Sequence, residues 1–189
     1  DIIDDLQHRD FTVNAMAVTL DGALLDPLEG LRDLQEGVLR VTNTAALRQD
    51  PARLVRAVRL LTQLDLALDA DSRDQIRATS EQVSSVAPER IQAELVLALA
   101  NPNAHRAVVL LAELDLLPYI LPEIAALWDA EPADSAKQAR RRRQFLAGVR
   151  SVAAFRTWLV GEATIDQAFA GLRIPDWILT ALDSELGDM

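Results

Sequence analysis

Apolar residues recur at helical spacing over most of the chain, most clearly between residues 51 and 64. Asp50 and Pro51 precede this segment, and they are a typical N-cap residue and a typical first helical residue. The pattern therefore predicts a helix over 51–64 with one buried side. The apolar positions that form its buried stripe are Leu54, Ala57, Val58, Leu60, Leu61 and Leu64.

The same periodicity continues through the rest of the chain beyond residue 45. Turn-forming residues at Asn101-Pro102-Asn103 and Gly161-Glu162 separate some of the periodic segments. The fold is therefore predicted to be mostly α. Further helices are expected over 72–83, 88–100, 103–115, 119–129, 135–148, 151–160, 164–171 and 175–186.

The beginning of the chain has a different pattern. Residues 10–17 predict a short helix. Val18-Thr19-Leu20 and Ala23-Leu24-Leu25 flank Asp21-Gly22, which is typical of a β-hairpin with a tight turn. A loop through two glycines, Gly30 and Gly37, is expected to follow.

These patterns divide the chain into three predicted parts. Residues 1–44 form the end of a mixed α/β head, which contributes the short helix and the hairpin. Residues 45–130 form a helical neck, and residues 131–189 form a helical body or tail. The change of pattern near residue 45 and the Glu131-Pro132-Ala133-Asp134 segment mark the two boundaries.

Three arginines, Arg53, Arg56 and Arg59, lie at every third residue of the predicted 51–64 helix. At about 100° per residue, they fan along one border of the apolar stripe. The arginine fork donates paired hydrogen bonds to phosphate or to a base edge. An ionised Asp50 only accepts hydrogen bonds, so it can read an amino group on a base. The arginines are therefore interpreted either as a solvated helix face whose stems lie over the core or as one wall of a nucleotide site.

Four blocks of sequence resemble motifs of the bacterial tRNA nucleotidyltransferase (CCA-adding) and poly(A) polymerase family, in the family's order. The likeness covers about the first half of the chain, and beyond residue 100 it is only to a helical region. The blocks are Asp5 to Ala17; Leu25-Asp26-Pro27-x-x-Gly30-x-x-Asp33-Leu34 with Leu39-Arg40-Val41 after it; Gln49 to Arg59; and Pro88-Glu89-Arg90-Ile91-x-x-Glu94-Leu95.

The resemblance implies a role for each matching residue of the nucleotide site. Arg9 is expected to contact the incoming nucleotide, Asp10 to lie near its ribose, and Asn14 to hold that segment in place. Asp50 and Arg53 are expected to read the base edge of ATP or CTP.

The resemblance also implies roles for two more arginines, and the sequence differs from the family's motifs at two positions. Arg56 and Arg59 are expected to support the base-reading group or to neutralise the triphosphate. His8 stands where the family usually has another arginine, so one cation is weaker near neutral pH. Gln49 stands where many members have glutamate, which removes a charge beside Asp50.

The family's metal-binding pair of aspartates would precede the motif that starts at Asp5. The parent enzyme is expected to use Mg²⁺ to bridge phosphate oxygens and activate the 3′ hydroxyl, with ligands outside this chain. The adjacent pair Asp4-Asp5 would point to opposite faces of an extended segment, which is a poor geometry for a shared metal. We therefore assign no catalytic or metal residue and expect this chain alone to be inactive.

The densest basic run, Arg140, Arg141, Arg142 and Arg143, is a candidate RNA contact. The net charge of −10 does not exclude this, because phosphate binding depends on the local patch. The alternative is a solvated helix, and four consecutive arginines must point all around a helix. Arg90 and Glu94 are interpreted as a structural pair along one helix.

The sequence therefore predicts the C-terminal portion of a template-independent RNA nucleotidyltransferase. The parent would add CMP, AMP or both from CTP and ATP to tRNA 3′ ends, and this portion would supply nucleotide selection and RNA binding. A poly(A) polymerase of the same family and a non-catalytic RNA-binding module from a split gene remain as alternatives. The absence of cysteine, of a signal peptide and of an apolar span predicts a cytoplasmic protein.

Overall fold

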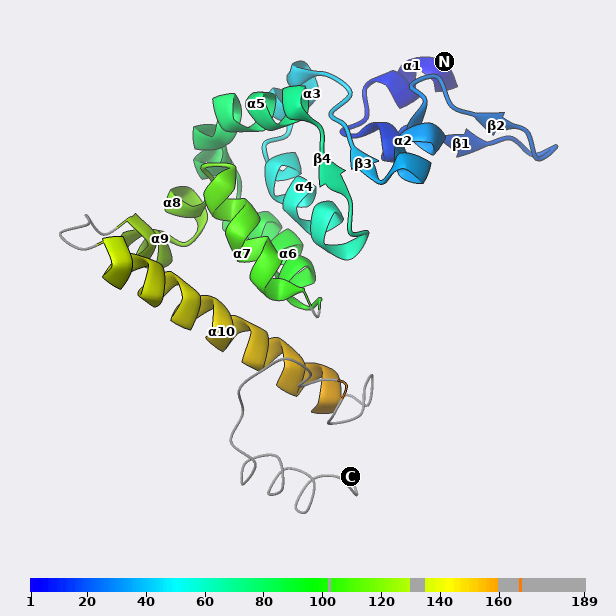
Figure 1. Ribbon diagram of the computed structural model, residues 1–189. Helices are drawn as coiled ribbons and strands as arrows, with labels where there is room; N and C mark the ends of the chain where they lie inside the picture. Colours follow the sequence, from blue (N-terminus) through cyan, green and yellow to red (C-terminus); the bar gives the residue numbers. More distant parts are fainter. Residues whose placement is uncertain (102, 130–134, 160–166, 168–189) are drawn as a thin grey trace.

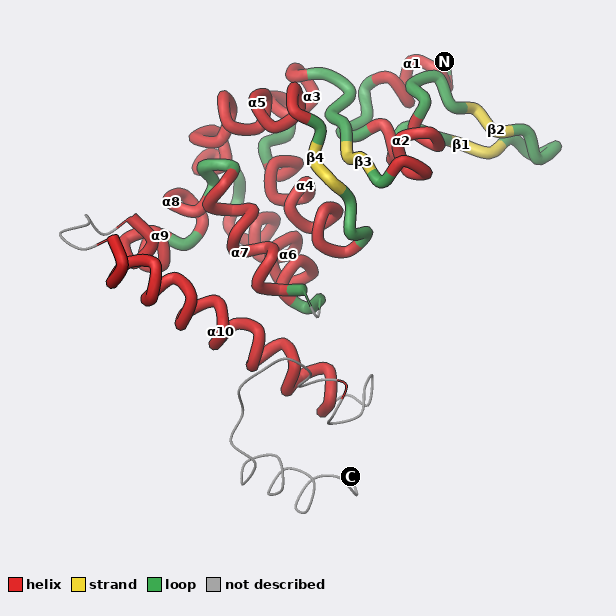
Figure 2. The backbone as a smooth tube through the Cα atoms, in the orientation of Figure 1, coloured by secondary structure: helices red, strands yellow, loops and turns green. Residues whose placement is uncertain are grey.

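The computed structural model describes residues 1–101, 103–129, 135–159 and 167 and is mostly helical, as predicted (Figures 1 and 2). A head of short elements is followed by a packed group of helices, and a long helix lies at the far side. In chain order the elements are α1 (Ile2–Gln7), η1 (Thr12–Asn14), β1 (Ala17–Val18), β2 (Leu24–Leu25), α2 (Gly30–Glu36), β3 (Val38–Leu39), α3 (Thr44–Gln49), α4 (Ala52–Gln63), β4 (Ala67–Leu68), α5 (Ala70–Thr79), η2 (Ser80–Ser85), α6 (Pro88–Leu99), α7 (Ala104–Glu113), α8 (Leu117–Ile120), α9 (Pro122–Asp129) and α10 (Ser135–Leu159).

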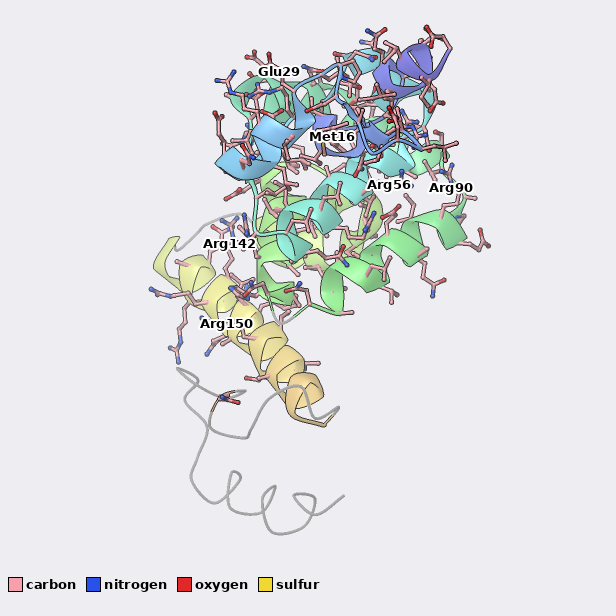
Figure 3. All side chains as sticks on the ribbon, turned by 90° about the vertical axis from the view of Figure 1, so that its right-hand side faces the viewer. Met16, Glu29, Arg56, Arg90, Arg142 and Arg150 are labelled. Atoms are coloured by element: carbon pink, nitrogen blue, oxygen red, sulfur yellow. The ribbon has the colours of Figure 1, made fainter. Side chains whose placement is uncertain are left out.

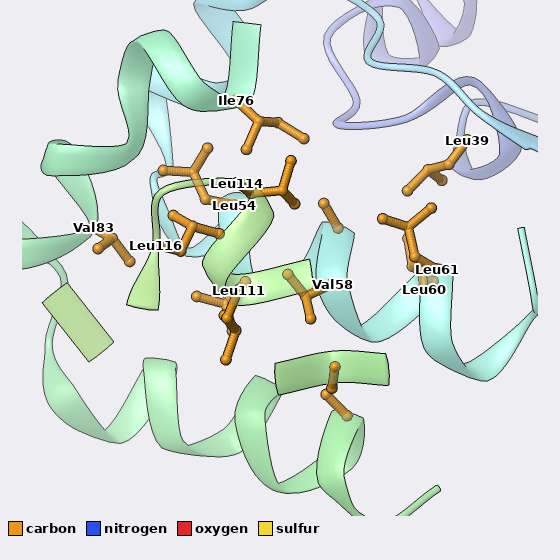
Figure 4. Packing of buried hydrophobic residues seen from close by; sticks show 14 of the residues in the cluster. Leu39, Leu54, Val58, Leu60, Leu61, Ile76, Val83, Leu111, Leu114 and Leu116 are labelled. Atoms are coloured by element: carbon orange, nitrogen blue, oxygen red, sulfur yellow. The ribbon is translucent and has the colours of Figure 1, made fainter. Parts of the chain in front are cut away.

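Helix α4 lies at the centre of the hydrophobic core. Leu54, Val58 and Leu61 of its predicted stripe are fully buried, and so is Val55, which falls outside the stripe. Helices α6 and α7 pack against α4, and residues such as Leu111 of α7 complete the cluster (Figure 4). Val55 is buried because α4 is covered on more than one side. The part of α4 that remains available for a site is therefore its cationic border, which is formed by Arg53, Arg56 and Arg59.

The predicted hairpin is confirmed. Strands β1 and β2 pair antiparallel, with Ala17 opposite Leu25 and Val18 opposite Leu24. Gly22 in the turn has φ +87°, a backbone conformation that glycine adopts without a steric cost. Strands β3 and β4 form a second pair, in parallel, that the sequence pattern did not predict.

Two predictions for the head were wrong. Residues 10–17 are not a helix, because the backbone at the start of this segment pairs with residues 40–42: Thr12 N donates to Arg40 O, and Thr42 N donates to Asp10 O. This leaves only the short turn η1. The expected loop between the two glycines contains α2, whose first N–H groups donate to the carboxylate of Asp26. Gly37, at φ +70°, ends that helix.

A close contact fixes α2 against η1. A Cβ atom at Gly30 would lie 2.0 Å from the carbonyl oxygen of Thr12, so only glycine fits. Beside it, the buried Asp33 accepts a hydrogen bond from Thr12 Oγ1 at 2.6 Å and another from Arg40 Nε at 3.2 Å. Arg40 Nη1 also donates to Asp69 at the start of α5. These contacts join the head to the helices that follow.

The later helices follow the prediction with shifted ends. Helix α5 gives way to η2 at residue 80, and the segment predicted over 119–129 is divided into α8 and α9. The break expected near residue 150 does not occur, since α10 is continuous. The helices predicted over 164–171 and 175–186 lie outside the described residues, except for Gln167. Within the described part of the chain, no helix is long and apolar enough to cross a membrane.

Candidate nucleotide site

A polar cavity of about 420 Å³ lies where α1, η1 and α4 meet. Its size is within the range of roughly 300–1,000 Å³ that is typical of small-molecule sites. The structure thus brings together the segment around Arg9-Asp10 and the arginine border of α4, which lie about 40 residues apart in the sequence. The side chains that line it are Asp5, His8, Arg9, Asp10, Asn14, Arg53 and Arg56.

Asp10 is the buried centre of this site. One carboxylate oxygen accepts from Phe11 N at 2.9 Å and from Asn14 Nδ2 at 3.0 Å. The other accepts from Arg56 Nη1 at 2.9 Å, and the side chain is 5% exposed. The expected role of Asn14 in holding this segment agrees with its hydrogen bond to Asp10. Asp10 itself has both oxygens occupied by the protein, so it joins the head to α4.

Arg56 and Arg59 share one partner on the neighbouring helix. Glu94 of α6 accepts from Arg56 Nε at 2.8 Å and from Arg59 Nε at 2.6 Å, one with each carboxylate oxygen. Arg59 also donates to Gln63 and does not line the cavity. Both guanidinium groups are therefore held by protein carboxylates, which suits a supporting role better than free phosphate contacts.

Asp50 and Arg53 lie at the N-terminal end of α4 with unpaired polar atoms. The Oδ1 of Asp50 and the Nε of Arg53 are buried and have no hydrogen-bond partner. The other Asp50 oxygen accepts from Arg90 Nη2 of α6 at 2.8 Å. Contrary to the prediction, Pro51 rather than Asp50 occupies the N-cap position of α4, and Arg53 N donates to the backbone oxygen of Asp50.

Arg53 is positioned by backbone atoms instead of by a close carboxylate. Its Nη1 donates to Ala46 O at 3.2 Å and to His8 O at 3.4 Å. The shortest distance from its Nε to Asp50 is 3.8 Å, beyond a hydrogen bond. An acceptor and a donor without partners thus lie next to each other. Burial of such atoms is costly unless a ligand pairs with them.

The hydrogen bond from Arg90 holds the pKa of the Asp50 carboxyl below its usual range, and Arg53 acts in the same direction. Desolvation opposes this shift but does not reverse it. Asp50 is therefore ionised at neutral pH and accepts hydrogen bonds only.

At the open side of the cavity, Arg9 donates to Asp5 through two nitrogens, at 2.7 and 3.2 Å. This hydrogen bond lowers the pKa of the Asp5 carboxyl. Both side chains are about half exposed, so the pair is weak and can rearrange around a ligand. His8 is also exposed, and its Nδ1 lies 2.7 Å from Asp4 O. Arg9 is the predicted nucleotide contact that is most accessible.

No group of three or more acidic or histidine side chains that could hold a metal ion occurs within the described part of the chain. Asp4 and Asp5 lie on α1 rather than on the extended segment considered above. Asp1 caps that helix and Asp5 pairs with Arg9. These carboxylates do not fit a magnesium site, and no step at a metal is assigned to them.

The predicted RNA contacts lie on α10, away from the cavity (Figure 3). Arg140, Arg141 and Arg143 are exposed, and Arg142 is half-buried. The structure therefore does not bring this run together with the nucleotide site.

Sequence reasoning missed two polar residues of α6. Arg90 and Glu94 were interpreted as partners of each other, and the structure pairs them with Asp50 and with Arg56 and Arg59 instead. The available signal was their place in the motif block that follows the block from Gln49 to Arg59.

Two family models match the chain. Residues 1–40 match the poly A polymerase head domain, and residues 65–127 match a probable RNA and SrmB-binding site of polymerase A.

Curated relatives match over more than half of the chain. It is 39% identical over 126 residues to the A-adding tRNA nucleotidyltransferase of Deinococcus radiodurans, which covers 64% of this chain and 29% of the relative. It is 43% identical over 103 residues to the CC-adding tRNA nucleotidyltransferase of Synechocystis sp., which covers 54% and 25%. The matched region thus represents less than a third of each of these relatives.

Solved structures resemble the whole chain. The Bacillus stearothermophilus CCA-adding enzyme in complex with CTP has a TM-score of 0.65 at 26% identity, covering 100% of this chain and 48% of that chain. The Thermotoga maritima CCA-adding enzyme complexed with tRNA has a TM-score of 0.58 at 22% identity, covering 93% and 55%. The second likeness concerns the fold alone.

Proposed function

Because the chain belongs to the family of tRNA nucleotidyltransferases and poly(A) polymerases, we propose that it selects the nucleotide and binds the RNA in such an enzyme. The parent would add CMP, AMP or both from CTP and ATP to the 3′ end of tRNA. The catalytic Mg²⁺ of the parent would be held by residues outside this chain.

The observation that carries this proposal is the unpaired acceptor and donor at Asp50 and Arg53. Cytosine and adenine each present an amino group beside a ring nitrogen that accepts hydrogen bonds. Asp50 Oδ1 would accept from the amino group, and Arg53 Nε would donate to the ring nitrogen. Uracil and guanine present a carbonyl oxygen beside a ring N–H, which reverses this order. The pair therefore favours CTP and ATP over UTP and GTP.

The other predicted residues would contact the phosphates or support the site. Arg9 is exposed and can leave Asp5 to contact the triphosphate, which is a stronger partner for a guanidinium. Arg56 and Arg59 would stabilise the reading end of α4 through Glu94. Asp10 and Asn14 would fix the segment that carries Arg9, since Asp10 is bound on three sides by the protein.

Helix α10 supports the RNA-binding half of the proposal. Its sequence contains Lys137, the four arginines of the basic run, Arg150 and Arg156, and no aspartate or glutamate. In a chain of net charge −10, this concentrates positive charge on one element. Arginines bind the phosphate backbone without reading sequence. An RNA backbone is the partner that fits it.

Nucleotide titration tests the base-reading pair. Asp50→Ala and Arg53→Ala should each weaken the binding of CTP and ATP by about tenfold or more, because each removes a hydrogen bond to a charged group. The binding of UTP should change little. Asp74→Ala, which removes an exposed carboxylate on α5, is the matched control and should leave all affinities unchanged.

The same variants in the full-length enzyme should lower the incorporation of CMP and AMP into tRNA that lacks its 3′ end. Wild-type protein that binds all four nucleotides equally, or variants that keep the preference for CTP and ATP, would contradict the roles proposed for Asp50 and Arg53.

A further inference from the structure

The two carboxylate oxygens of Asp50 differ in their contacts. Its Oδ2 accepts from Arg90 Nη2 at 2.8 Å, and its Oδ1 is buried without a partner. Arg90 comes from the first turn of α6, about 40 residues further along the chain. The contact of Arg90 with Asp50 therefore decides which oxygen of Asp50 remains free.

Without Arg90, Asp50 and Arg53 could pair with each other. They lie three residues apart, and the Nε of Arg53 is 3.8 Å from Asp50 Oδ2, less than 1 Å beyond hydrogen-bonding distance. The Nε of Arg53 is buried without a partner, so an ion pair with Asp50 Oδ2 would satisfy it. It would also remove the free donor that a base needs beside Asp50 Oδ1. Arg90 opposes this by holding Oδ2 from the other side.

Arg90 itself is placed by Glu94, four residues later on α6. Glu94 binds Arg56 and Arg59 at 2.8 and 2.6 Å and so fixes α6 along the cationic border of α4. Figure 3 shows Arg56 and Arg90 on the same side of the molecule. The Arg90 side chain is 53% exposed, so its replacement leaves no cavity in the core. Glu94 provides the fixed framework, and Arg90 provides the contact.

We infer that Arg90 is a specificity-determining positioning residue, which holds one oxygen of Asp50 so that the other oxygen and the Nε of Arg53 stay free for the nucleotide base. The inference rests on the proposed function of Asp50 and Arg53 as base readers. Arg90 does not touch the base in this arrangement. It acts through Asp50, and it determines the direction of that carboxylate.

Loss of Arg90 should also change the pH dependence of nucleotide binding. The charged groups that face Asp50 are Arg90 from α6 and Arg53 from α4, and the hydrogen bond from Arg90 is the largest cause of its lowered pKa. Without that hydrogen bond the pKa of Asp50 rises. A protonated Asp50 no longer presents an acceptor-only carboxylate, so binding would be lost at a higher pH during acidification.

The test measures the affinities of CTP, ATP, UTP and GTP for the full chain by calorimetry. In Arg90→Ala, the ratio of CTP to UTP affinity should fall by about tenfold, because a hydrogen bond to a charged group is lost from the reading geometry. The acid limb of CTP binding, which is the fall of CTP affinity as the pH decreases, should move to higher pH. Arg90→Lys keeps the charge without the planar fork and should restore part of the ratio.

Arg77→Ala is the matched control. Arg77 is 47% exposed, pairs with Asp115 at 3.4 Å and lies on α5, outside the cavity. Its replacement should leave the CTP to UTP ratio and the acid limb unchanged. Circular dichroism of each variant checks that the helices are retained.

The outcomes separate the two proposals. Wild-type protein that prefers CTP, together with an Arg90→Ala variant of unchanged ratio and unchanged acid limb, overturns the role of Arg90 and leaves the proposed function intact. Wild-type protein without a preference among the four nucleotides overturns the proposed function and the role of Arg90 with it. A fall in the ratio that also occurs in Arg77→Ala would assign the effect to a general loss of surface charge and overturn the inference.

Discussion

At the scale of single residues, Glu94 holds two arginines with one carboxylate. This carboxylate is 12% exposed and binds Arg56 and Arg59. Glu94→Gln would remove the charged partner that the two partly buried guanidinium groups share, and Arg56 would keep its ion pair with Asp10. We expect a loss of about 2 kcal/mol in the free energy of unfolding, measured by urea denaturation of the full chain.

Glu36→Gln is the control for that measurement. Glu36 pairs with Arg32 at 3.0 Å on α2, but both side chains are more than half exposed. Its loss should cost about 0.5 kcal/mol or less. Equal destabilisation by the two substitutions would show that Glu94 does not act as a shared partner.

Residue identities in the pocket could be predicted better than their partners. The motif around Asp10 and the arginines of α4 indicated that these segments meet, and the structure places Arg53 and Arg56 in one cavity with Asp10. The partners of Arg90 and Glu94 could not be predicted, since a spacing of four residues fits an ion pair along the helix equally well. Only the packing of α6 on α4 decides between these pairs.

At the scale of elements, the approach of α2 to η1 depends on Gly30. A methyl group there would lie 2.0 Å from a backbone oxygen that cannot rotate away. Gly30→Ala should therefore destabilise the chain by about 2 kcal/mol or more, as overpacking does. Since η1 carries Asn14, nucleotide binding should weaken as well. Thermal unfolding and CTP titration together measure both effects.

Gly148→Ala provides the opposite case. Gly148 lies inside α10, and a Cβ atom there would meet nothing within 4 Å. Alanine should stabilise this helix by about 0.5–1 kcal/mol relative to glycine. A stabilising Gly30→Ala would contradict the close contact between α2 and η1.

Element types were predictable where the apolar period is long, as in α4, α6 and α7. Element types were not predictable where contacts with other segments or side-chain capping override the apolar pattern. Backbone pairing with residues 40–42 takes the place of the helix that the pattern favours over 10–17, and Asp26 starts a helix where two glycines suggested a loop. The β3–β4 pair is two residues long in each strand, too short to leave a period in the sequence.

At the scale of the whole molecule, an acidic chain carries a strongly basic helix, α10. If α10 binds an RNA backbone, tRNA affinity should fall steeply with salt, as cations released from the RNA take part in the equilibrium. Replacing the exposed Arg140 and Arg143 together with alanine should reduce the slope of log affinity against log salt by roughly 1–2. Filter binding between low and moderate salt measures the slope.

Arg32→Ala is the control for the RNA measurement, because Arg32 is exposed but paired with Glu29 and Glu36 on α2. The slope of log affinity against log salt for the Arg32→Ala variant should equal that of the wild type. An unchanged slope in the Arg140 and Arg143 double variant would place the RNA elsewhere on the molecule.

The contacts between α4 and α6 determine which segments would have to be exchanged together in a chimeric protein. Arg90 contacts Asp50 at the proposed base-reading end of α4, and Glu94 contacts the arginines of its border, although both residues lie on α6. A graft of 49–59 from a relative with another nucleotide preference would bring new side chains to old partners. Both segments, 49–59 and 88–95, would have to be transplanted as a pair for the donor's preference to be inherited.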